Sequence, residues 1–386
     1  MAVKIIHTAD VHLDSTFGRI GGAKGARKRE AIRNTFRRII DDCIAWPADI
    51  LVIAGDLFEE ERVSSDTIGF LKTQFARLKD TPVVIAPGNH DPFTVSSRYA
   101  VTDWGPNVHL FTRGSLGRFS FPSLGIDVYG AAHVSTHMSG RLIDLVGAAE
   151  SGPGLPLLVV HASSDASIPS DKAADDIWLP FSRAEIERLG YGYVALGHYH
   201  APSDFTADGR VIAAYPGSPE GLRASETGRR HYVRVTLDRD GAKVERAPVS
   251  EIDFSEFEIP CDSFQSREGF IQAVMNLEAG DAARLIARIR ATGRVAPGFD
   301  LSARLPAEIF ERFFYVSIID ETVPAYDWDA IAAEKSLRGE VVRLFAKEVA
   351  AAGPSAAEAL ERARLYALDA LAGRPVELPA EVLRVD

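Results

Sequence analysis

Five short apolar runs in the N-terminal half of the chain each lead directly into a polar cluster. The runs contain Val, Ile and Leu without alternation, a pattern typical of strands that are buried on both faces. The clusters that follow them are Ala9-Asp10-Val11-His12, Gly55-Asp56-Leu57-Phe58, Pro87-Gly88-Asn89-His90-Asp91, His161-Ala162-Ser163 and Gly197-His198-Tyr199-His200. This recurrence predicts that several strands end at one polar region.

Segments with helical periodicity separate the first three runs. Residues 28–44 and 65–78 place apolar side chains at helical spacing. Alternating strands and helices predict right-handed crossovers and a partly parallel sheet, in which ligands bind beyond the carboxyl ends of the strands. Residues 118–121 with 125–129, and 232–237 with 243–249, predict antiparallel hairpins.

The C-terminal third has a different pattern. Residues 250–259 are expected to link to a small mixed α/β unit, with strands near 254–260, 284–290 and 314–319. Helices are predicted at 266–277, 328–351 and 356–372. We therefore expect a body over 1–250, a smaller domain over 251–353, and a helix with a tail over 354–386.

Composition narrows the class of protein. The chain has 386 residues, which favours two domains, and its two cysteines fit a reducing compartment. The N-terminus resembles neither a signal peptide nor a spanning helix, so a cytoplasmic protein without membrane association is expected. The net charge of −11 argues against binding nucleic acid by bulk charge, but not against a local basic surface.

The polar clusters contain carboxylates, an amide and imidazoles, a thiolate-free set suited to Mn, Fe or Zn. One ion needs about four to six ligands, so this set predicts a pair of ions bridged by one carboxylate, for which Asp56 is our choice. Asp10 and His12, two residues apart, should leave the same face of extended chain. Gly55, Gly88 and Gly197 are expected at sharp turns. The alternative is that each cluster is an ordinary hydrogen-bonded loop. The candidate ligands are Asp10, His12, Asp56, Asn89, His161, His198 and His200.

In order and approximate spacing, these motifs resemble those of calcineurin-like metallophosphoesterases. The segments HTADVHLD, AGDLF, APGNHDP and LGHYHAP further resemble the nuclease subunit of bacterial SbcCD and its archaeal and eukaryotic repair relatives. The resemblance implies a four-layer α/β/β/α sandwich with a smaller C-terminal α/β capping domain and a helical tail. It also implies a two-metal DNA exonuclease or endonuclease that acts in DNA repair.

The same resemblance implies roles for single residues. One ion would be held by Asp10, His12, Asp56 and His200, and the other by Asp56, Asn89, His161 and His198. His90 would lie beside the scissile phosphate, with Asp91 as the carboxylate that orients it. Manganese is the usual ion of this family. An SMC-like coiled-coil ATPase, held by the C-terminal helix, would be the partner, and a homodimer is a further expectation.

One position departs from the family pattern. Close relatives usually follow the GDLF segment with a histidine that is linked to exonuclease action, whereas here Glu59 and Glu60 follow Phe58. We therefore expect intact metal binding with altered handling of the substrate.

Two basic clusters are candidates for DNA contacts. Residues 19–38 contain eight basic residues and one acidic residue, Glu30. Such a segment beside the metal site would bind the phosphates of DNA. The alternative is that these residues form a solvated helix face without a ligand. The candidate contacts are Arg19, Lys24, Arg27, Lys28, Arg223 and Arg229.

Two other functions stay open at this point. The same metal core could serve a phosphoesterase that acts on a nucleotide, a small phosphodiester or a phosphoprotein. A metal-bound scaffold that regulates its ATPase without catalysis is the other alternative. The remaining histidines, His7 and His133 among them, lack ligand-like spacing and are expected to be structural.

Overall fold

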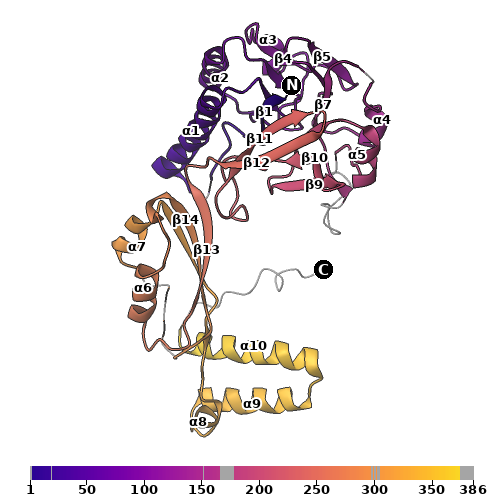
Figure 1. Ribbon diagram of the computed structural model, residues 1–386. Coiled ribbons are helices and arrows are strands. Elements are labelled where there is room, and N and C mark those ends of the chain that lie inside the picture. Colours follow the sequence, from indigo (N-terminus) through magenta and orange to yellow (C-terminus); the bar gives the residue numbers. More distant parts are fainter. Residues whose placement is uncertain are drawn as a thin grey trace. The chain divides into compact units, whose positions relative to one another are not determined.

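The computed structural model describes residues 2–18, 20–150, 152–165, 178–296, 299, 301 and 305–373. The chain divides into two compact units, which we describe separately (Figure 1). The first comprises Met1–Glu256, Ala279–Arg288 and Phe313–Val316. The second comprises Phe257–Glu278, Ile289–Arg312 and Ser317–Asp386.

Within the described residues, twelve strands of the first unit form one mixed sheet in the order β4-β3-β2-β1-β11-β12-β10-β8-β7-β6-β5, with β9 paired to β10. Strands β1 to β4 are parallel neighbours, as are β6, β7, β8 and β10. Both predicted hairpins are confirmed, as β5–β6 and β11–β12. The strands are β1 Val3–Thr8, β2 Ile50–Ile53, β3 Val83–Ile85, β4 Val108–Leu110, β5 Gly117–Phe121, β6 Ile126–Gly130, β7 Leu155–His161, β8 Tyr193–Gly197, β9 Ser203–Ala207, β10 Arg210–Tyr215, β11 His231–Asp238 and β12 Gly241–Pro248.

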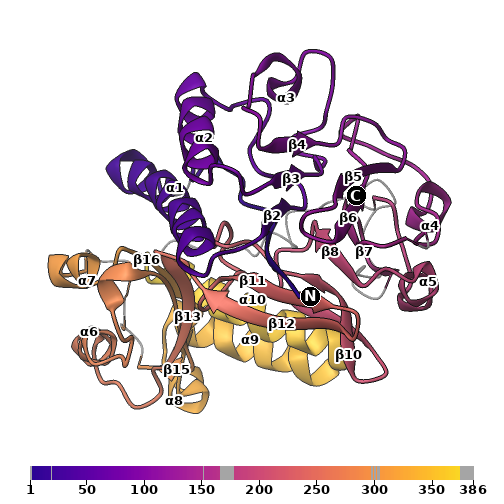
Figure 2. The same ribbon diagram turned by 45° about the horizontal axis from the view of Figure 1, so that its top comes forward.

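The two parallel halves of this sheet share a core. Alternate side chains of β1 point to opposite faces: Ile5 packs in one cluster with Val128 of β6, and Ile6 packs with α1 and α2. A third cluster lies between β7, β8 and helices α4 and α5. Figures 1 and 2 show α1 and α2 on one side of the unit and α4 and α5 on the other. The two expected sheets are thus two halves of one continuous sheet. These helices, with α3, are α1 Gly22–Ala45, α2 Ser65–Arg77, α3 Arg98–Val101, α4 Leu142–Leu145 and α5 Arg183–Leu189.

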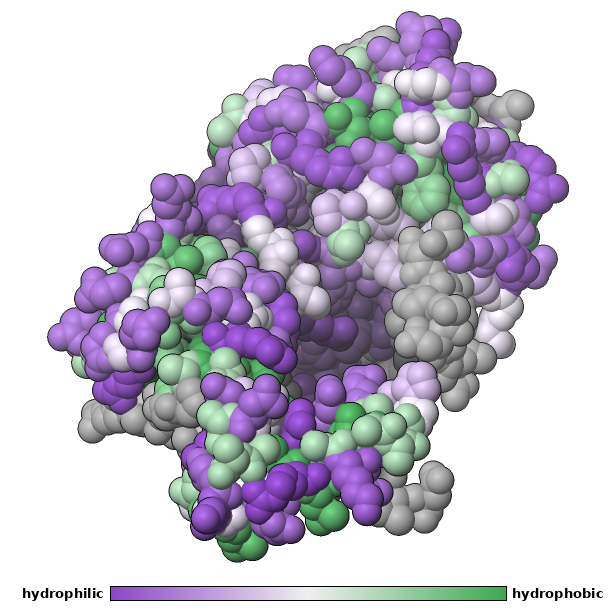
Figure 3. Space-filling view, turned by 90° about the horizontal axis from the view of Figure 1, so that it is seen from below, coloured by the Kyte–Doolittle hydropathy of each residue, from purple (hydrophilic) through white to green (hydrophobic). Residues whose placement is uncertain are grey.

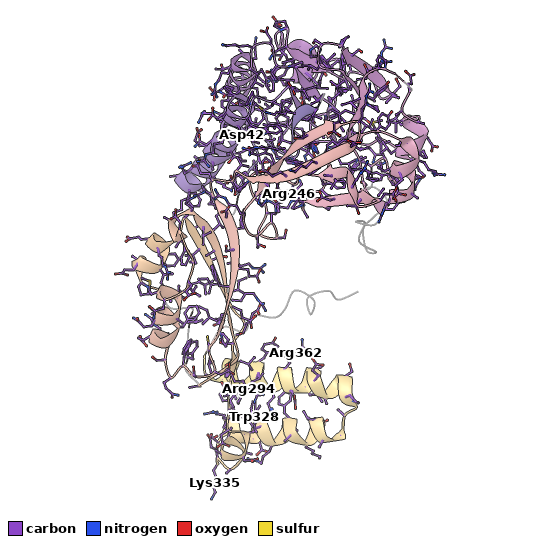
Figure 4. All side chains as sticks on the ribbon, viewed as in Figure 1. Asp42, Arg246, Arg294, Trp328, Lys335 and Arg362 are labelled. Atoms are coloured by element: carbon purple, nitrogen blue, oxygen red, sulfur yellow. The ribbon has the colours of Figure 1, made fainter. Side chains whose placement is uncertain are left out.

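Helix α1 begins at Gly22, six residues before the helical periodicity predicted from residue 28. Its buried face includes Ile32, Phe36 and Ile39, and packs against the sheet. Near its end, Asp42, labelled in Figure 4, accepts a hydrogen bond from Arg234 Nε of β11 at 2.8 Å. Helix α1 is therefore fixed by both apolar packing and a charged pair.

The C-terminal part begins with two small sheets. Strands β13 Asp253–Pro260, β14 Leu285–Thr292 and β16 Tyr315–Asp320 form one, and β15 Arg294–Val295 with β17 Val323–Pro324 forms the other. The helices with them are α6 Arg267–Met275, α7 Ala307–Arg312 and a 3₁₀ turn at Ala282–Arg284.

Three helices close the described chain: α8 Trp328–Ala332, α9 Leu337–Ala351 and α10 Pro354–Leu371. The single helix predicted over 328–351 is wrong. Ser336 caps a new helix by accepting from Gly339 N at 3.1 Å, and a side chain at Gly339 would collide with the carbonyl oxygen of Glu334. Trp328, labelled in Figure 4, lies 3.8 Å from the Arg364 guanidinium.

The surface mixes polar and apolar side chains on the face shown in Figure 3. Among the described residues, no helix combines the length and apolarity needed to span a membrane.

Candidate metal centre

The polar clusters that follow β1, β2, β3, β7 and β8 meet at one end of the sheet. Backbone hydrogen bonds join the first two, since Asp10 N donates to Gly55 O at 3.1 Å and His12 N donates to Asp56 O at 3.0 Å. The predicted convergence of the strand ends is therefore present in the fold.

Four of the candidate ligands have left-handed backbone, with φ of 53° at Asp10, 50° at His12, 52° at Asp56 and 113° at His198. Such angles are uncommon for residues with a Cβ and persist where the surrounding structure enforces them. The expectation that Asp10 and His12 lie on extended chain is wrong. Turns, rather than strand alternation, bring both side chains to the site.

The glycines permit close approach between the loops. A side chain at Gly88 would collide with the Asp56 carboxylate, and one at Gly197 would collide with the Ala54 carbonyl oxygen. Of the three predicted turn glycines, Gly55 has a positive φ, 86°, whereas Gly88 and Gly197 serve mainly as contact points.

The imidazoles and oxygens form compact groups around Asp56. Its Oδ2 atom lies 3.5 Å from His12 Nε2 and 3.3 Å from His161 Nε2. His12 Nε2 also lies 3.2 Å from His200 Nε2, and His161 Nε2 lies 3.0 Å from Asn89 Oδ1. One carboxylate oxygen thus faces both halves of the site. The groups able to hold an ion among the described residues include Asp10 with His12 and His200, and Asp10 with Asp56 and His161.

His198 joins the site from β8. Its backbone N donates to both oxygens of Asp10, at 3.0 and 3.1 Å. Its ring packs edge-on against that of His161, with centroids 5.3 Å apart, and against Trp178 at 4.9 Å.

The outer nitrogens of three imidazoles have acceptors as partners. Nδ1 of His12 lies 2.8 Å from Glu59 Oε1, that of His200 lies 2.8 Å from Glu226 Oε1, and that of His161 lies 2.9 Å from Ala54 O. These acceptors place the proton on Nδ1, so each Nε2 directs a lone pair into the site. Nitrogen lone pairs and carboxylate oxygens that converge in this way repel one another unless a cation or a proton lies between them. The residues therefore fit divalent ions.

Electrostatics supports this reading. Burial raises the pKa of Asp10. Burial alone would lower the pKa of His161, but the Asp56 carboxylate outweighs it and the pKa rises to about 9. Burial would raise the pKa of Glu226, but the hydrogen bond and charge of His200, together with hydrogen bonds from Leu222 N and Ser218 Oγ, lower it to about 2. Without metal, the raised pKa values favour protonated Asp10 and His161, and metal binding would displace these protons.

Asp91 has a different position from the one expected. Its buried carboxylate accepts from Gly88 N at 2.7 Å, from Leu57 N at 2.7 Å and from Tyr99 Oη at 2.8 Å. It thus ties together the loops after β2 and β3. The carboxylate that faces His90 Nδ1 is that of Glu59, at 3.0 Å, so the assignment of Asp91 as the orienting residue is wrong.

The basic residues expected to contact DNA differ in their exposure and in their ion pairs. Lys28 is fully buried, with Nζ donating to Glu220 at 2.6 Å, and this position leaves it no surface for a phosphate. Lys24 and Arg27 are exposed, although Arg27 pairs with Glu251. Arg229 pairs with Asp253 at 3.3 Å. Arg19 lies outside the described residues.

A cavity of about 610 Å³ opens onto the site. Its lining combines metal-site residues with His90, Trp178, Tyr199 and Arg223. The sequence reasoning missed Trp178 and the carboxylate of Glu226. The contact of Glu226 with His200 spans 26 residues, and no local motif marks it.

Fold, cavity and the His/Asp cluster together define a metal-dependent phosphoesterase. The model of the calcineurin-like phosphoesterase family matches residues 3–202, and the chain belongs to that family. It is 29% identical over 238 residues to the uncharacterized metallophosphoesterase YhaO of Bacillus subtilis, covering 60% of this chain and 56% of that protein.

The chain is also distantly related to proteins named DNA double-strand break repair protein Mre11. Identity is 24% over 267 residues to that of Methanopyrus kandleri, covering 62% of this chain and 55% of that protein. It is 26% over 308 residues to that of Haloferax volcanii, covering 75% and 62%. The chain thus spans less than two thirds of the length of these relatives.

Proposed function

We propose that the protein is a two-metal phosphodiesterase that cleaves DNA. The observation that carries this proposal is the convergence of His12 Nε2 and His161 Nε2 on Asp56 Oδ2, beside a cavity that also contains His90. His200 Nε2 lies next to that of His12, and Asn89 Oδ1 next to that of His161. Such a centre suits hydrolysis of a phosphodiester, because two cations can neutralise charge on the phosphate.

We assign Asp10, His12, Asp56 and His200 to one ion, and Asp56, Asn89, His161 and His198 to the other. The position of Asp56 Oδ2 between His12 and His161 supports its bridging role. Mixed imidazole and carboxylate donors without thiolates favour Mn²⁺, with Fe or Zn as alternatives.

When bound, the ions would supply an activated water and positive charge at the phosphate. The chain's own residues complete the site. Asp91 holds the loops that carry Asp56 and Gly88. His90 lies at the cavity, with its Nδ1 held by Glu59, so it can pass a proton to the departing oxygen.

DNA as the substrate is supported by the Mre11 relatives and by exposed positive side chains, one of them at the cavity. Arg223 lines the cavity, and Lys24 and Arg27 are exposed on α1. We further propose that residues 251–353 guide DNA, and that the C-terminal helix, α10, binds an SMC-like coiled-coil ATPase. A homodimer is also proposed, by likeness to the same relatives.

The direct test compares cleavage of linear duplex DNA, circular single-stranded DNA and bis-p-nitrophenyl phosphate with Mn²⁺. We expect cleavage of DNA, loss of bound metal and activity in Asp56→Asn, and retained metal with lost DNA cleavage in His90→Asn. Activity on the small diester without any on DNA would favour a small-molecule phosphoesterase. Bound metal without turnover on any substrate would favour the scaffold alternative.

A further inference from the structure

Two arginines line the cavity together with His200. Arg230 is only 6% exposed, whereas Arg223 is exposed. Neither guanidinium has an ion-pair partner among the described residues. Both therefore give the cavity positive charge that no carboxylate neutralises by direct contact.

The side chain of Arg230 is fixed by the loops beside the metal site. Its Nε atom donates to Ser218 O at 3.1 Å. Its Nη2 atom donates to Ser218 Oγ at 3.1 Å and to the carbonyl oxygen of His200. The backbone is fixed as well, since Arg230 N donates to Ser250 Oγ at 3.0 Å. The guanidinium is thus held in one orientation against the backbone of a proposed metal ligand.

The third nitrogen of this guanidinium, Nη1, has no such task. It has no hydrogen-bond partner among the described residues, and it is not one of their enclosed polar atoms. Buried polar groups are normally hydrogen-bonded within the protein. Because Arg230 lines the cavity, its Nη1 is a rigid donor that is open to a ligand there.

The carboxylate of Glu226 also lines this part of the cavity. Its Oε1 atom accepts from His200, and its Oε2 atom accepts from Ser218 and Leu222. Both oxygens are therefore occupied, and neither contacts an arginine among the described residues. The two guanidinium groups stay available for an anion.

We propose that Arg223 and Arg230 form a second phosphate subsite, which binds a phosphate that neighbours the scissile one in the same substrate. This inference rests on the proposed hydrolysis of phosphodiesters and narrows the substrate class to molecules with at least two phosphates. The neighbouring phosphate is either a phosphodiester within a DNA strand or a monoester at the end of a strand. Both have the same charged oxygens.

The chemistry of the two arginines suits this task. Guanidinium N–H groups form charge-assisted hydrogen bonds with phosphate oxygens, and their planar fork matches the phosphate geometry. Arg230 is already immobilised, so binding costs it little side-chain entropy. Its contact with the His200 backbone places it one residue away from the proposed ion. The two phosphates would thus lie at adjoining sites.

The test compares thymidine oligonucleotides with Mn²⁺. TpT has one phosphate, TpTpT has a second internal phosphate, and pTpT and TpTp have a terminal one. The measured quantity is the preference, defined as kcat/KM for a substrate with two phosphates divided by kcat/KM for TpT. For the wild type we expect a preference of about 10-fold or more for at least one of these substrates.

Arg223→Gln and Arg230→Lys should each lower that preference to about threefold or less, because each removes a charge-assisted contact. The matched control is Arg239→Gln, at an exposed position in the turn between β11 and β12, which loses the same charge and should keep the wild-type preference. If Arg230→Lys does not fold, Arg223→Gln decides the question, since Arg223 is exposed and has no ion pair among the described residues.

The pattern of preference identifies the source of the second phosphate. Preference for TpTpT alone assigns the subsite to a phosphodiester within a strand, and preference for pTpT or TpTp assigns it to a terminal phosphate. A wild type without any preference would overturn the proposal. A preference that Arg223→Gln leaves unchanged, or that Arg239→Gln lowers equally, would do the same.

Failure of the subsite and failure of the proposed function are distinguishable. If the wild type cleaves neither DNA nor these oligonucleotides, the nuclease function fails. The subsite is then measured by calorimetric titration of the Mn²⁺-loaded protein with thymidine 3′,5′-bisphosphate and with thymidine 5′-monophosphate. The bisphosphate should bind about 10-fold more tightly, and Arg223→Gln should remove most of this difference. Equal affinity for the two nucleotides would show that the subsite does not exist.

Discussion

At the scale of single residues, the metal centre depends on which imidazole nitrogen carries the proton. Glu226 sets this for His200, while its other oxygen accepts from Ser218 Oγ at 2.8 Å and from Leu222 N at 2.9 Å. One carboxylate oxygen of Glu226 thus accepts from His200, and the other accepts from Ser218 and Leu222. Replacing one oxygen by NH₂ should disturb the ligand without removing it.

We predict that Glu226→Gln weakens metal binding by about 10- to 100-fold. The amide oxygen must serve Leu222 and Ser218, so the NH₂ group faces Nδ1 of His200 and forces the ring proton onto Nε2, the proposed ligand atom. Calorimetric titration with Mn²⁺ measures the effect. Glu245→Gln, at an exposed position, is the control. Unchanged affinity would show that Glu226 does not set the tautomer.

The sequence motifs predicted which residues form the site. They did not predict which of these residues contact one another. Asp56 was named from the end of its strand, and its position between two imidazoles agrees with a bridging role. Asp91 was misassigned because its neighbour in sequence, His90, turns away from it toward Glu59. Contacts of this kind depend on how separate loops meet, which local sequence does not encode.

At the scale of elements, strand ends converge only if their backbones come very close. Gly197 ends β8 against the carbonyl oxygen of Ala54, which follows β2. This contact between β8 and the residue after β2 joins the two halves of the sheet next to the metal-site residues. This contact leaves no room for a methyl group.

Gly197→Ala should therefore destabilise the protein by about 1–3 kcal/mol or more, through overpacking. Metal binding should weaken with it, since His198 and His200 directly follow β8. Gly69→Ala on α2 is the matched control: its Cβ meets open space, and a helical alanine should add up to about 1 kcal/mol of stability. Urea unfolding of the three proteins measures both effects. Equal stability of wild type and Gly197→Ala would contradict the close approach.

Strand β1 contains a buried histidine that should make folding sensitive to acid. His7 is bonded to Tyr193 Oη at 3.0 Å and to Leu196 O at 3.2 Å, and burial lowers its pKa to about 3. The unfolded chain binds a proton below about pH 6.5, whereas the folded chain does not. The contribution of neutral His7 to the free energy of unfolding is therefore complete above about pH 6.5, and it is lost as the pH falls toward 3.

We expect the free energy of unfolding to fall by about 1.4 kcal/mol per pH unit from this group across that window. His7→Gln, which can keep both hydrogen bonds without titrating, should remove this part of the slope. Urea unfolding at pH 7.0 and 5.5, with chelator present, gives the comparison, and the exposed His137→Gln is the control. Equal slopes in wild type and His7→Gln would contradict the prediction.

The elements themselves were largely predictable, because buried strands and amphipathic helices have strong periodicities. The errors lie where tertiary contacts decide an end. Helical periodicity was predicted only from residue 28, yet α1 begins at Gly22, and a serine cap with a tight glycine contact divides α8 from α9. These contacts override local propensity.

At the scale of the whole molecule, a buried charge network joins distant segments of the first unit. Lys28 Nζ of α1 donates to Glu220 Oε1 at 2.6 Å and to Ile252 O at 2.8 Å, while Glu220 also accepts from the backbone N of Glu251 and Ile252. Length alone predicted two units. It could not show that segments 279–288 and 313–316 return to the first.

Because these later segments belong to the first unit, truncating the chain before them should destabilise that unit. A fragment that ends at residue 250 keeps every proposed metal ligand but loses the core around Ala31, which contains Ile252, Phe254 and Ile286. It also loses the carbonyl partner of Lys28. Burial of each large apolar side chain contributes about 1.5–3 kcal/mol, which is large against a total stability of about 5–15 kcal/mol.

We therefore expect the fragment 1–250 to unfold at least about 10 °C below the full chain, and to bind metal weakly for that reason. A chain that ends at residue 325 is the matched control. It loses α8 to α10, whose buried residues Ile331, Val342 and Leu368 form a core of their own, and it keeps every segment of the first unit. Its melting temperature and its activity on bis-p-nitrophenyl phosphate should match those of the full chain. If 1–250 is as stable as 1–325, the segments after residue 250 do not support the metal-binding unit, and the boundary expected from the sequence at residue 250 would stand.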